Sequence, residues 1–380
     1  MERDELELLR RVWFPVARLQ DLRPGPVGAT LLGQELVVYG GVDGPTVADG
    51  WCPHRGMKLS MGSMQAGELQ CSYHGWRFAS GSGRCTHVPS LPPHLPPTRV
   101  SLKTHPVYVA YGLVWSCLDE PCLPPLQIPE LDVAPWEAVA DPDLYQYRIG
   151  EWTYALGDPA TVRCGIRALT ENFRDMSHFA FVHARSMGSG VRREVDEYRV
   201  EKDGWRLRYT LSSHPDGVVL KDGDGGAGAA RQGETFADVA YGRTNQYTLV
   251  LPSFSYIFSR LPAGGRRLVA QFVAPGPDPA TSRLFWAVGI DDEVRERHHQ
   301  TIRQAHDFDD QIFHEDFQIV ENSWPREQPL DTRSQVHTRA DAYSIAYRRR
   351  YRELLDQVRE RYGSDGNSAF PMPATSSIDS

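Results

Sequence analysis

The sequence predicts an α+β protein in which an all-β domain precedes a domain of helices packed on an antiparallel sheet. Short apolar runs with turn-forming residues between them fill residues 12–118, and this spacing is typical of an all-β domain. Beyond residue 120, alternating runs follow one another and two long helical patterns come after them. Strands that run together, rather than alternating with helices, indicate an antiparallel sheet.

Length and a change of composition predict two domains and a tail. A chain of 380 residues exceeds one average domain. The segment EPCLPPLQIPELD, which begins at Glu120, is rich in proline and lies where the pattern changes. We therefore expect one domain over residues 1–120, a second over 121–362 and a flexible tail over 363–380.

The first domain begins with a short amphipathic helix over residues 1–10. Its strand candidates, separated by turn signals such as VDGP and SGSG and by a Pro-rich stretch at Pro89–Pro97, are ELVVYGG, TVADGWC, ELQCSYHGWRF and VYVAYGLVWSCL. We expect the tips of these hairpins to carry the metal-ligand candidates described below.

The second domain opens with helical spacing at the start of ALTENFRDMSHFAFVH. The alternating runs that predict its sheet are WRLRYTLSS, NQYTLVLPSFSYIFSR, RRLVAQFVAPG and SRLFWAVGI. A long helical pattern runs from Asp291 to about Asn322, and another runs from His337 to about Tyr362.

The composition argues against several classes of protein. A net charge of −8 without a basic run disfavours nucleic-acid binding. No apolar stretch reaches the length of a membrane span, and the charged N-terminus lacks a signal-peptide core. We therefore expect no membrane association and a cytoplasmic location. Four scattered cysteines suit reduced thiols there, namely Cys85, Cys117, Cys122 and Cys164.

Two cysteines and two histidines form the most informative motif. Cys52 and His54 lie in WCPHRG, Cys71 and His74 lie in CSYHGW, and sixteen residues separate the two pairs. Two thiolates and two imidazoles can hold a [2Fe–2S] cluster with sulfur on one iron and nitrogen on the other, which raises its potential to roughly −150 to +300 mV. Such a cluster carries single electrons.

Zinc is the main alternative at this motif, because zinc also accepts two cysteines and two histidines. A zinc finger pairs cysteine with cysteine and histidine with histidine, whereas each half here combines one of each. Each half is also followed by a glycine, Gly56 or Gly75. Glycine suits the tight loops that bring backbone N–H groups toward cluster sulfurs, so the cluster is the favoured interpretation.

In this motif the chain resembles the Rieske family. The respiratory-chain members of that family carry an extra cysteine in each ligand loop, and Met57 and Tyr73 stand at those positions here. The chain is therefore similar to the Rieske proteins of oxygenases and their ferredoxins. A ferredoxin needs only a fraction of this length, so the remainder must have another role.

A second metal site is indicated by the sequence TENFRDMSHFAFVH. It supplies His178 and His183, five residues apart, with Glu171, Asn172 and Asp175 upstream. Two imidazoles and one carboxylate can occupy one face of ferrous iron and leave the other face open for O₂ and substrate. The alternative is a core histidine with a satisfied hydrogen bond, which the neighbouring Phe179 and Phe181 would suit.

The carboxylate must come from another segment, and Asp316 is the first candidate. It shares the apolar face of a predicted helix with Ile312, Phe313, Ile319 and Val320. A carboxylate buried there is costly unless a metal or a partner compensates. Asp309 is the second candidate on the same stripe, and Asp310 and Glu315 point to the side. A salt bridge from Asp316 to an arginine is the alternative to a metal.

These residues extend the resemblance to nearly the whole chain. Asn172, Asp175, His178 and His183 match the mononuclear-iron motif N-x-x-D-x-x-H-x-x-x-x-H of Rieske non-haem iron oxygenases. The carboxylate helix of their monooxygenase and demethylase branch resembles F-x-E-D-x-x-x-x-E, here Phe313, Glu315, Asp316 and Glu321. The chain is thus similar to an oxygenase (alpha) subunit of that branch.

The resemblance implies a role for each of these residues. Cys52, His54, Cys71 and His74 would hold the [2Fe–2S] cluster, and His178, His183 and Asp316 would hold mononuclear Fe(II). Asn172 and Asp175 would be catalytic residues, with Asp175 passing the electron from His74 of a neighbouring subunit. A head-to-tail homotrimer is then implied, because in the family the two metals of one subunit lie too far apart.

The expected activity is an O₂-dependent oxygenation of a small organic substrate, aromatic or resembling a natural product. Hydroxylation, oxidative demethylation and oxidative ring formation all occur in the family, and the ligands do not distinguish them. Electrons would come from NAD(P)H through a separate reductase or ferredoxin. The rival functions are a Rieske electron carrier without oxygenase chemistry and a zinc-binding interaction protein.

One further motif is rejected as a cofactor site. Gly223, Gly225 and Gly228 form G-x-G-x-x-G, but polar AARQGE follows instead of a helix that could pack on a sheet. We interpret this stretch as a surface loop. With no other nucleotide signature in the sequence, the reducing power is expected from a separate protein.

Overall fold

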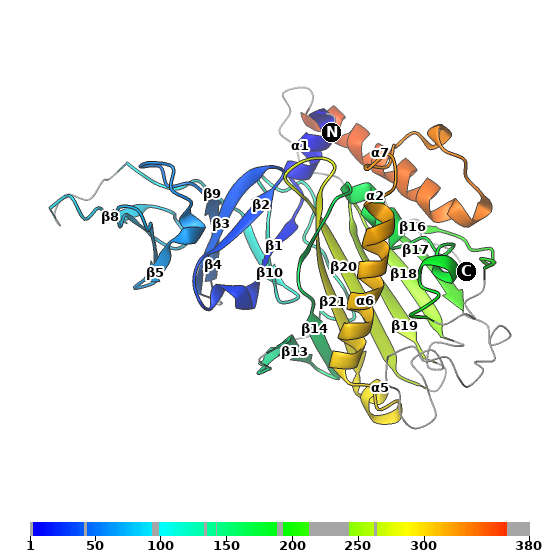
Figure 1. Ribbon diagram of the computed structural model, residues 1–380. Coiled ribbons are helices and arrows are strands. Elements are labelled where there is room, and N and C mark those ends of the chain that lie inside the picture. The colour runs from blue at the N-terminus through cyan, green and yellow to red at the C-terminus, as the bar shows by residue number, and fades with distance from the viewer. Residues whose placement is uncertain are drawn as a thin grey trace. The chain divides into compact units, whose positions relative to one another are not determined.

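The computed structural model describes residues 3–41, 44–92, 99–132, 135–141, 143–187, 193–212, 243–261 and 264–362. These residues form two compact units (Figure 1). The first contains residues 1–127 and 274–279 together with the end of the last helix from Val358, and the second contains most of the rest. The boundary near residue 120 stays a prediction. The tail over 363–380 and the loop at Gly223–Gly228 lie outside the described residues.

The first unit is built from short strands, as the spacing of its apolar runs predicts. Helix α1 (Arg3–Arg10) precedes them. One sheet has the order β1 (Phe14–Arg18), β11 (Leu113–Ser116), β10 (Val107–Ala110). A second has the order β2 (Val27–Leu31), β3 (Gln34–Gly41), β4 (Gly44–Asp49), β9 (Thr104–His105), and a third has β5 (Ser63–Gln65), β6 (Glu68–Gln70), β7 (Arg77–Phe78), β8 (Cys85–His87).

The predicted strand ELQCSYHGWRF is wrong in its middle. It is a hairpin of β6 and β7, and Cys71–Trp76 form the connecting loop. The loop is closed by backbone hydrogen bonds from Cys71 N to Trp76 O (2.9 Å) and from Gly75 N to Cys71 O (3.0 Å). These bonds replace the ladder that a continuous strand would form, and they place Cys71 and His74 at a hairpin tip.

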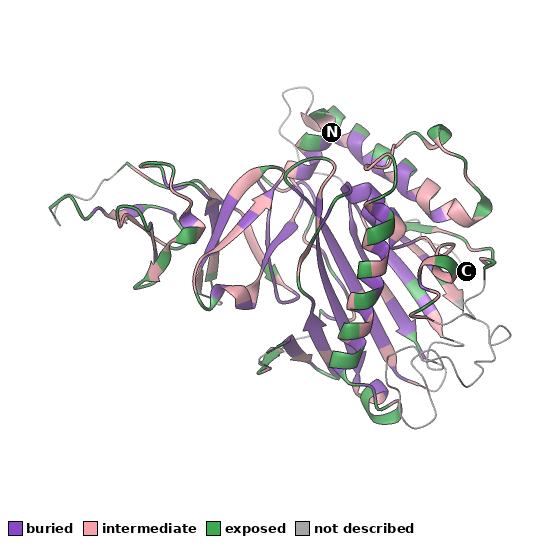
Figure 2. Cartoon of the chain, in the orientation of Figure 1, coloured by how far each residue is buried: buried purple, intermediate pink, exposed green. Residues whose placement is uncertain are grey.

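The second unit contains one large sheet, with neighbouring strands paired antiparallel as predicted. Its order is β12 (Trp136–Val139), β13 (Tyr145–Ile149), β14 (Trp152–Leu156), β21 (Ser282–Asp291), β20 (Arg266–Pro275), β19 (Phe254–Arg260), β18 (Thr244–Val250), β17 (Arg206–Ser212), β16 (Glu201–Asp203), and β15 (Ala160–Val162) pairs with β21. Its central strands are mostly buried (Figure 2).

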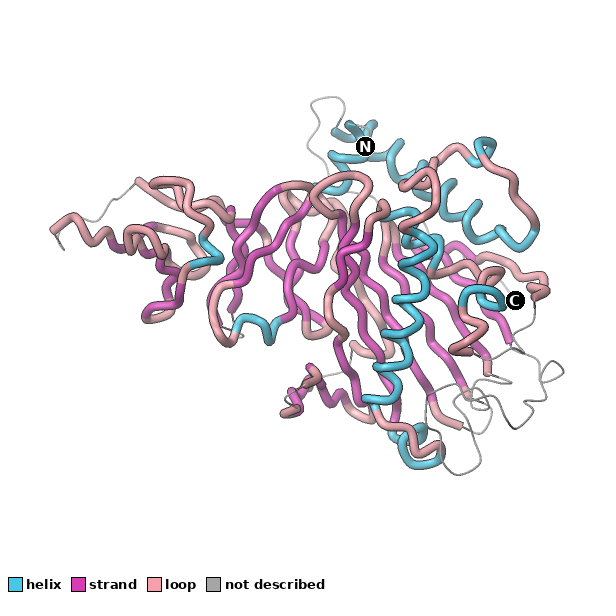
Figure 3. Tube along the Cα trace, in the orientation of Figure 1, coloured by secondary structure: helices cyan, strands magenta, loops and turns pink. Residues whose placement is uncertain are grey.

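Helices of the second unit flank this sheet (Figure 3). They are α2 (Ile166–Asn172), α3 (Phe179–Val182), α5 (Asp292–Arg297), α6 (Ile302–Val320) and α7 (Ala342–Tyr362). Helix α6 runs across one face of the sheet (Figure 1) and contacts β21, β14 and α2. Within the described part of the chain, no helix is both long and apolar enough to cross a membrane.

The predicted helix from Asp291 to Asn322 is interrupted, which is a correction. Helix α5 ends before His298, and His299 adopts a positive φ of 49°. Helix α6 then begins with a capping box, in which Thr301 and Gln304 satisfy each other's backbone N–H groups. The periodicity of the sequence spans both segments and therefore predicts one helix, but the end of α5 and the N-terminal cap of α6 divide it into two.

A buried ion pair joins α2 to α7. Arg348 Nε donates to Glu171 Oε1 (2.6 Å) and Arg348 Nη2 donates to Glu171 Oε2 (2.8 Å). Both side chains are buried, and burial raises the pKa of Glu171 even with the arginine beside it. The carboxylate therefore depends on Arg348 for its charge.

Arg348→Met should destabilise the chain by about 3–5 kcal/mol, because it leaves the Glu171 carboxylate buried without a cation. Chemical denaturation of the full chain measures the effect. Arg349→Met, one position along at an exposed site, is the matched control and should change the free energy of unfolding by less than about 0.5 kcal/mol. Equal effects of the two substitutions would contradict the argument.

Candidate metal centres

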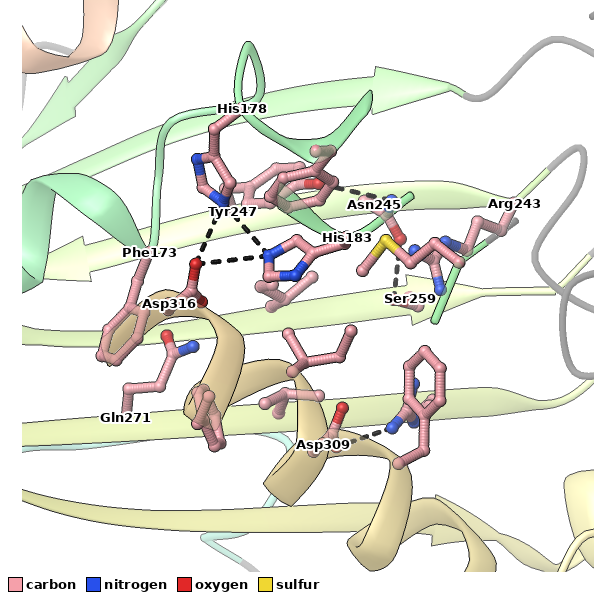
Figure 4. A pocket seen from close by; sticks show the side chains of 18 residues that line it. Phe173, His178, His183, Arg243, Asn245, Tyr247, Ser259, Gln271, Asp309 and Asp316 are labelled. Carbon is pink, nitrogen blue, oxygen red and sulfur yellow. Dashed lines mark hydrogen bonds and ion pairs between the residues drawn. The ribbon is translucent and has the colours of Figure 1, made fainter. Parts of the chain in front are cut away.

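Three side chains from two distant segments converge in the second unit. The Nε2 atoms of His178 and His183 lie 3.2 Å apart, and each lies 3.2 Å from Asp316 Oδ1 (Figure 4). The two histidines flank α3, and Asp316 lies on α6. His183 and Asp316 are buried, while His178 is partly exposed.

The triangle of these three atoms fits one face of a metal's coordination sphere. With metal–ligand bonds of about 2.0–2.2 Å, adjacent ligands of an octahedron stand about 3 Å apart, close to the 3.2 Å found here. Two imidazoles and one carboxylate in such an arrangement are the donor set of non-haem Fe(II) oxygenases. The assignment of His178, His183 and Asp316 as ligands stays a prediction that this geometry supports.

Neighbouring side chains change the pKa values of Asp316 and His178. Burial opposes ionisation of Asp316, but hydrogen bonds from the two histidines outweigh it and lower the pKa of the carboxyl group. Burial likewise opposes protonation of His178, but Asp175 and Asp316 outweigh it and raise the pKa of this imidazole to about 9. A metal cation that binds here would displace the proton from His178 and supply the positive charge in its place.

The two candidate carboxylates on α6, Asp316 and Asp309, have different partners. Asp309 is also buried and lines the same pocket, but its Oδ2 accepts from Arg267 Nη2 at 2.6 Å. The salt bridge considered for Asp316 is therefore found at Asp309. Ile319 was expected on the buried face and is 44% exposed, because it lies at the edge of the apolar stripe.

Asp175 and Asn172 surround the triad. Asp175 Oδ2 lies 3.2 Å from His178 Nδ1, and its Oδ1 accepts from Ser177 N at 2.8 Å. The Asp175 side chain is 35% exposed. Asn172 Nδ2 donates to Asp316 Oδ1 at 3.3 Å. Both residues thus contact a candidate ligand, and their catalytic roles stay predictions.

Glu315 is a site residue that the sequence reasoning placed to the side of the helix. Its Oε2 lies 2.8 Å from His183 Nδ1 and accepts from Ser186 Oγ at 2.7 Å. A carboxylate that accepts from Nδ1 fixes the tautomer in which Nε2 is free to bind a metal. The sequence signal that could have identified Glu315 was its position directly before Asp316. Adjacent side chains on a helix point in different directions, so these two carboxylates can contact opposite sides of the same imidazole, here that of His183.

Glu315→Gln should weaken iron binding about tenfold or more, because a neutral amide holds the His183 imidazole less firmly. Competition with a chelator, followed by iron analysis, measures the affinity. Asp310→Asn is the control on the same helix, since Asp310 is 43% exposed and contacts His314 instead. Unchanged iron affinity in Glu315→Gln would show that the contact does not orient the ligand.

A pocket opens beside the triad and continues between the sheet and α6. It contains about 630 Å³ of empty space, a volume that includes open solvent. Its apolar lining includes Phe173, Phe179, Ile257, Val269 and Phe313. Polar side chains at Asn245, Ser259 and Gln271 face it from β18, β19 and β20 (Figure 4).

The first unit brings the other predicted ligands together in two similar loops. In each, the cysteine N–H bonds to a carbonyl five residues ahead, Met57 O for Cys52 (2.8 Å) and Trp76 O for Cys71 (2.9 Å). In each, the cysteine carbonyl accepts from a glycine N–H four residues ahead. Gly56 and Gly75 have φ of +65° and +70°, so only glycine fits without strain.

The side chains of these loops fit a cluster with two cysteine and two histidine ligands. Burial, together with the neighbouring Cys71 thiol, raises the pKa of Cys52 to about 11, and a side-chain hydrogen bond joins the two thiols. The rings of His54 and His74 have centroids 4.5 Å apart. His54 Nδ1 is buried without a hydrogen-bond partner among the described residues, which leaves it available as a ligand atom. His74 is exposed.

Comparison with known families agrees with both centres. Residues 12–106 match the Rieske [2Fe-2S] domain, and residues 162–357 match the vanillate O-demethylase oxygenase C-terminal domain. The first match favours an iron–sulfur cluster over zinc at the cysteine–histidine motif. The second spans half of the chain and includes the His-His-Asp site, so the chain is an oxygenase rather than an electron carrier.

Individual relatives point the same way. The methylxanthine N1-demethylase NdmA of Pseudomonas putida is 27% identical over 374 residues, which cover 97% of this chain and 93% of NdmA. Dicamba O-demethylase, oxygenase component, of Stenotrophomonas maltophilia is 31% identical over 183 residues, which cover 47% of this chain and 48% of that protein. Oxidoreductase NdmD of P. putida is 41% identical over 118 residues, only 20% of its length and 30% of this chain.

Solved structures establish the same fold. The structure of P. putida NdmA with caffeine matches with a TM-score of 0.74 at 24% identity and covers 100% of both chains. The structure of dicamba monooxygenase bound to dicamba matches with a TM-score of 0.69 at 19% identity, covering 93% of this chain and 99% of that one. With a Rieske domain, a His-His-Asp candidate iron site and demethylase relatives, the chain belongs to the Rieske non-haem iron oxygenases, as an oxygenase alpha subunit related to NdmA and dicamba O-demethylase.

Proposed function

We propose that this oxygenase removes a methyl group oxidatively from the nitrogen or oxygen of a small aromatic or heteroaromatic substrate. The observation that carries the proposal is a largely apolar pocket that ends on the triad of His178, His183 and Asp316. A flat, apolar molecule that fills this pocket would present one methyl group to the metal position. Ferrous iron held by these side chains would supply the activation of O₂.

The pocket's own residues bind the substrate and exclude water. Phe173 and Phe313 pack edge to face with ring centroids 5.3 Å apart, and both line the pocket beside Asp316. Aromatic walls favour a flat apolar substrate. The anionic Asp316 lowers the net charge that the site carries with a bound cation, and Asn172 holds one of its oxygens in place by a hydrogen bond.

The reaction balances with an external source of electrons. One O₂, two electrons and two protons convert the methyl group to a hydroxymethyl group and water. The hydroxymethyl group then leaves as formaldehyde when its C–N or C–O bond breaks. The names of NdmA and dicamba O-demethylase favour this outcome over ring formation. Hydroxylation at carbon requires the same first step and differs only in the position of the C–H bond that the substrate presents.

Electrons would arrive from NAD(P)H through a reductase or a ferredoxin, as the match to the oxidoreductase NdmD suggests. They would enter at the Rieske cluster and leave through the exposed His74. In our proposed route Asp175 receives the electron on the side of the mononuclear site, because its partly exposed carboxylate contacts His178. We propose that the route joins neighbouring subunits of a homotrimer. A cytoplasmic location also remains a prediction.

Anaerobic iron and acid-labile sulfide analysis, followed by turnover assays with NADH and a reductase, tests the function. Methylxanthines and methoxybenzoates are the first substrates to screen. Formaldehyde released in proportion to the O₂ consumed supports demethylation, whereas a hydroxylated product without formaldehyde supports hydroxylation. If the iron content stayed at two atoms per chain after ferrous iron had been added back, the result would contradict the oxygenase proposal.

A further inference from the structure

An arginine lies fully buried behind the pocket wall. Arg174 is 1% exposed, and its Nη2 donates to Ser255 Oγ at 2.6 Å and to Gln271 Oε1. Its backbone carbonyl accepts from Tyr209 OH at 3.0 Å, and its guanidinium stands 5.8 Å from the ring centroid of Tyr247. These contacts join the Arg174 guanidinium to side chains of β19 and β20.

Gln271 is oriented by this arginine. A guanidinium only donates hydrogen bonds, so the Gln271 side chain must turn its oxygen toward Arg174. Ser255 Oγ, directly opposite on β19, donates to the same oxygen at 3.0 Å. The amide nitrogen then faces away from both groups, toward the middle of the pocket (Figure 4). No hydrogen bond from this nitrogen occurs among the described residues, although Gln271 is only 4% exposed.

The same arrangement is repeated on the next pair of strands. Asn245 on β18 stands opposite Ser259 on β19, and Ser259 Oγ donates to Asn245 Oδ1 at 2.7 Å. The amide nitrogen of Asn245 lies 3.4 Å from Tyr247 OH, a long contact. Both amides therefore have their oxygens occupied within the sheet, but the Asn245 nitrogen donates to Tyr247 OH. Of these two pocket-lining amides, Gln271 is the one whose N–H groups have no partner among the described residues.

We propose that Gln271 is a specificity-determining residue that donates an N–H hydrogen bond to an sp² oxygen of the substrate, and that Arg174 is the positioning residue that sets the direction of this donor. This inference rests on the proposed function, in that it takes the pocket beside the triad to be the substrate site. The substrate class is a flat molecule that carries a carbonyl or carboxylate oxygen in addition to the methyl group that is removed.

The physical reason is the cost of an unpaired donor. A substrate without an acceptor covers the buried Gln271 N–H groups and leaves them unpaired, whereas a substrate oxygen at that position satisfies them. Arg174 prevents the alternative, because a flipped amide would place its own N–H groups against the guanidinium. The wall thus discriminates by polarity, while the aromatic residues discriminate by shape.

Three probes with one ring and one methoxy group test the inference. They are 3-methoxybenzamide, 3-methoxybenzoate and 3-methylanisole, which present a neutral carbonyl, a carboxylate and no second oxygen. Calorimetric dissociation constants, measured anaerobically on the full chain with both iron sites loaded, give a preference ratio. We expect the wild type to bind at least one of the first two about tenfold more tightly than 3-methylanisole. Tighter binding of 3-methoxybenzamide would indicate a substrate with a neutral carbonyl, and tighter binding of 3-methoxybenzoate would indicate a substrate with a carboxylate.

Gln271→Glu is the decisive variant, because a carboxylate keeps the contact with Arg174 but has no N–H group. It should lose the tenfold preference and should bind 3-methoxybenzoate more weakly than the wild type does. Gln246→Glu makes the same change on β18, two strands away in the same sheet, at an exposed position, and should leave all three affinities unchanged. Arg174→Met should reduce the preference ratio, and Arg174→Lys should restore part of it, whereas mere structural damage would weaken the three probes together.

Equal affinities for the three probes, no binding of any probe, or a preference that persists in Gln271→Glu would each overturn the inference. Its failure can be told from failure of the proposed function. Selective binding without O₂-dependent turnover would leave the inference standing and reject demethylation of these probes. Turnover of 3-methylanisole as efficient as that of the oxygen-bearing probes would support the function and reject the role of Gln271.

Discussion

Asp316→Ala should remove the mononuclear iron and abolish turnover while the Rieske cluster remains intact. Asp316 supplies the only carboxylate within reach of both His178 Nε2 and His183 Nε2 in the described candidate site, at 3.2 Å from each. Two imidazoles alone leave the cation without its charge-neutralising ligand. The loss should exceed the 10–100-fold effect that contacts outside the ligand set produce. The iron content should fall from three atoms per chain, two in the cluster and one at the mononuclear site, to the two atoms of the cluster.

Two other aspartates on the same helix make this a sharp test. Asp309→Asn changes the second sequence candidate, which pairs with Arg267, and should keep the third iron even if the chain becomes less stable. Asp307→Ala changes a 64% exposed side chain and should leave iron, turnover and stability unchanged. The EPR spectrum of the reduced cluster is the internal control for all three. A third iron retained in Asp316→Ala, or lost in Asp309→Asn, would reject the assignment.

The choice between Asp309 and Asp316 shows what the sequence could and could not predict. Both lie on the apolar stripe of α6, seven residues apart, and periodicity places them on the same side. They differ in what stands opposite, which is Arg267 on β20 for one and the histidine loop for the other. The apolar stripe ranked Asp316 first and Asp309 second, and the family motif agreed with this order. The partners themselves are distant in sequence, so the sequence alone does not show which carboxylate meets an arginine and which meets the histidines.

The fold was predictable to a similar extent. Local patterns gave the β-rich first part, the strands of the large sheet and its flanking helices. They did not give the split at Cys71–Trp76 or the break at His298–Thr301, where loop closure and capping override the periodicity. The Ser255–Gln271 and Ser259–Asn245 pairs were also beyond the sequence, because they depend on the register of three strands.

Asp175→Ala should leave both metal centres in place and still slow turnover by about 100-fold or more. Asp175 is not part of the triad, so the iron and sulfide contents should stay at wild-type values. Among the described residues, Asp175 supplies the only carboxylate within hydrogen-bond distance of His178 Nδ1, so the substitution removes this contact and with it the proposed link to the cluster. The direct measurement is single turnover: the protein is reduced chemically, then mixed with O₂ and substrate, and reoxidation of the cluster is followed optically. A normal reoxidation rate would reject the link.

Mixed oligomers can then test whether the electron crosses between subunits. His74→Ala should destroy the cluster and leave Asp175 intact, whereas Asp175→Ala should keep the cluster and lose the link, so each variant alone is inactive. If the route runs between neighbours, oligomers assembled from both variants contain interfaces where an intact His74 meets an intact Asp175, and part of the activity returns. If the route runs within one chain, no chain in the mixture has both residues and activity stays absent. Size-exclusion chromatography with light scattering on the same samples establishes whether mixed trimers formed, so that missing activity counts against the inter-subunit route only where they did.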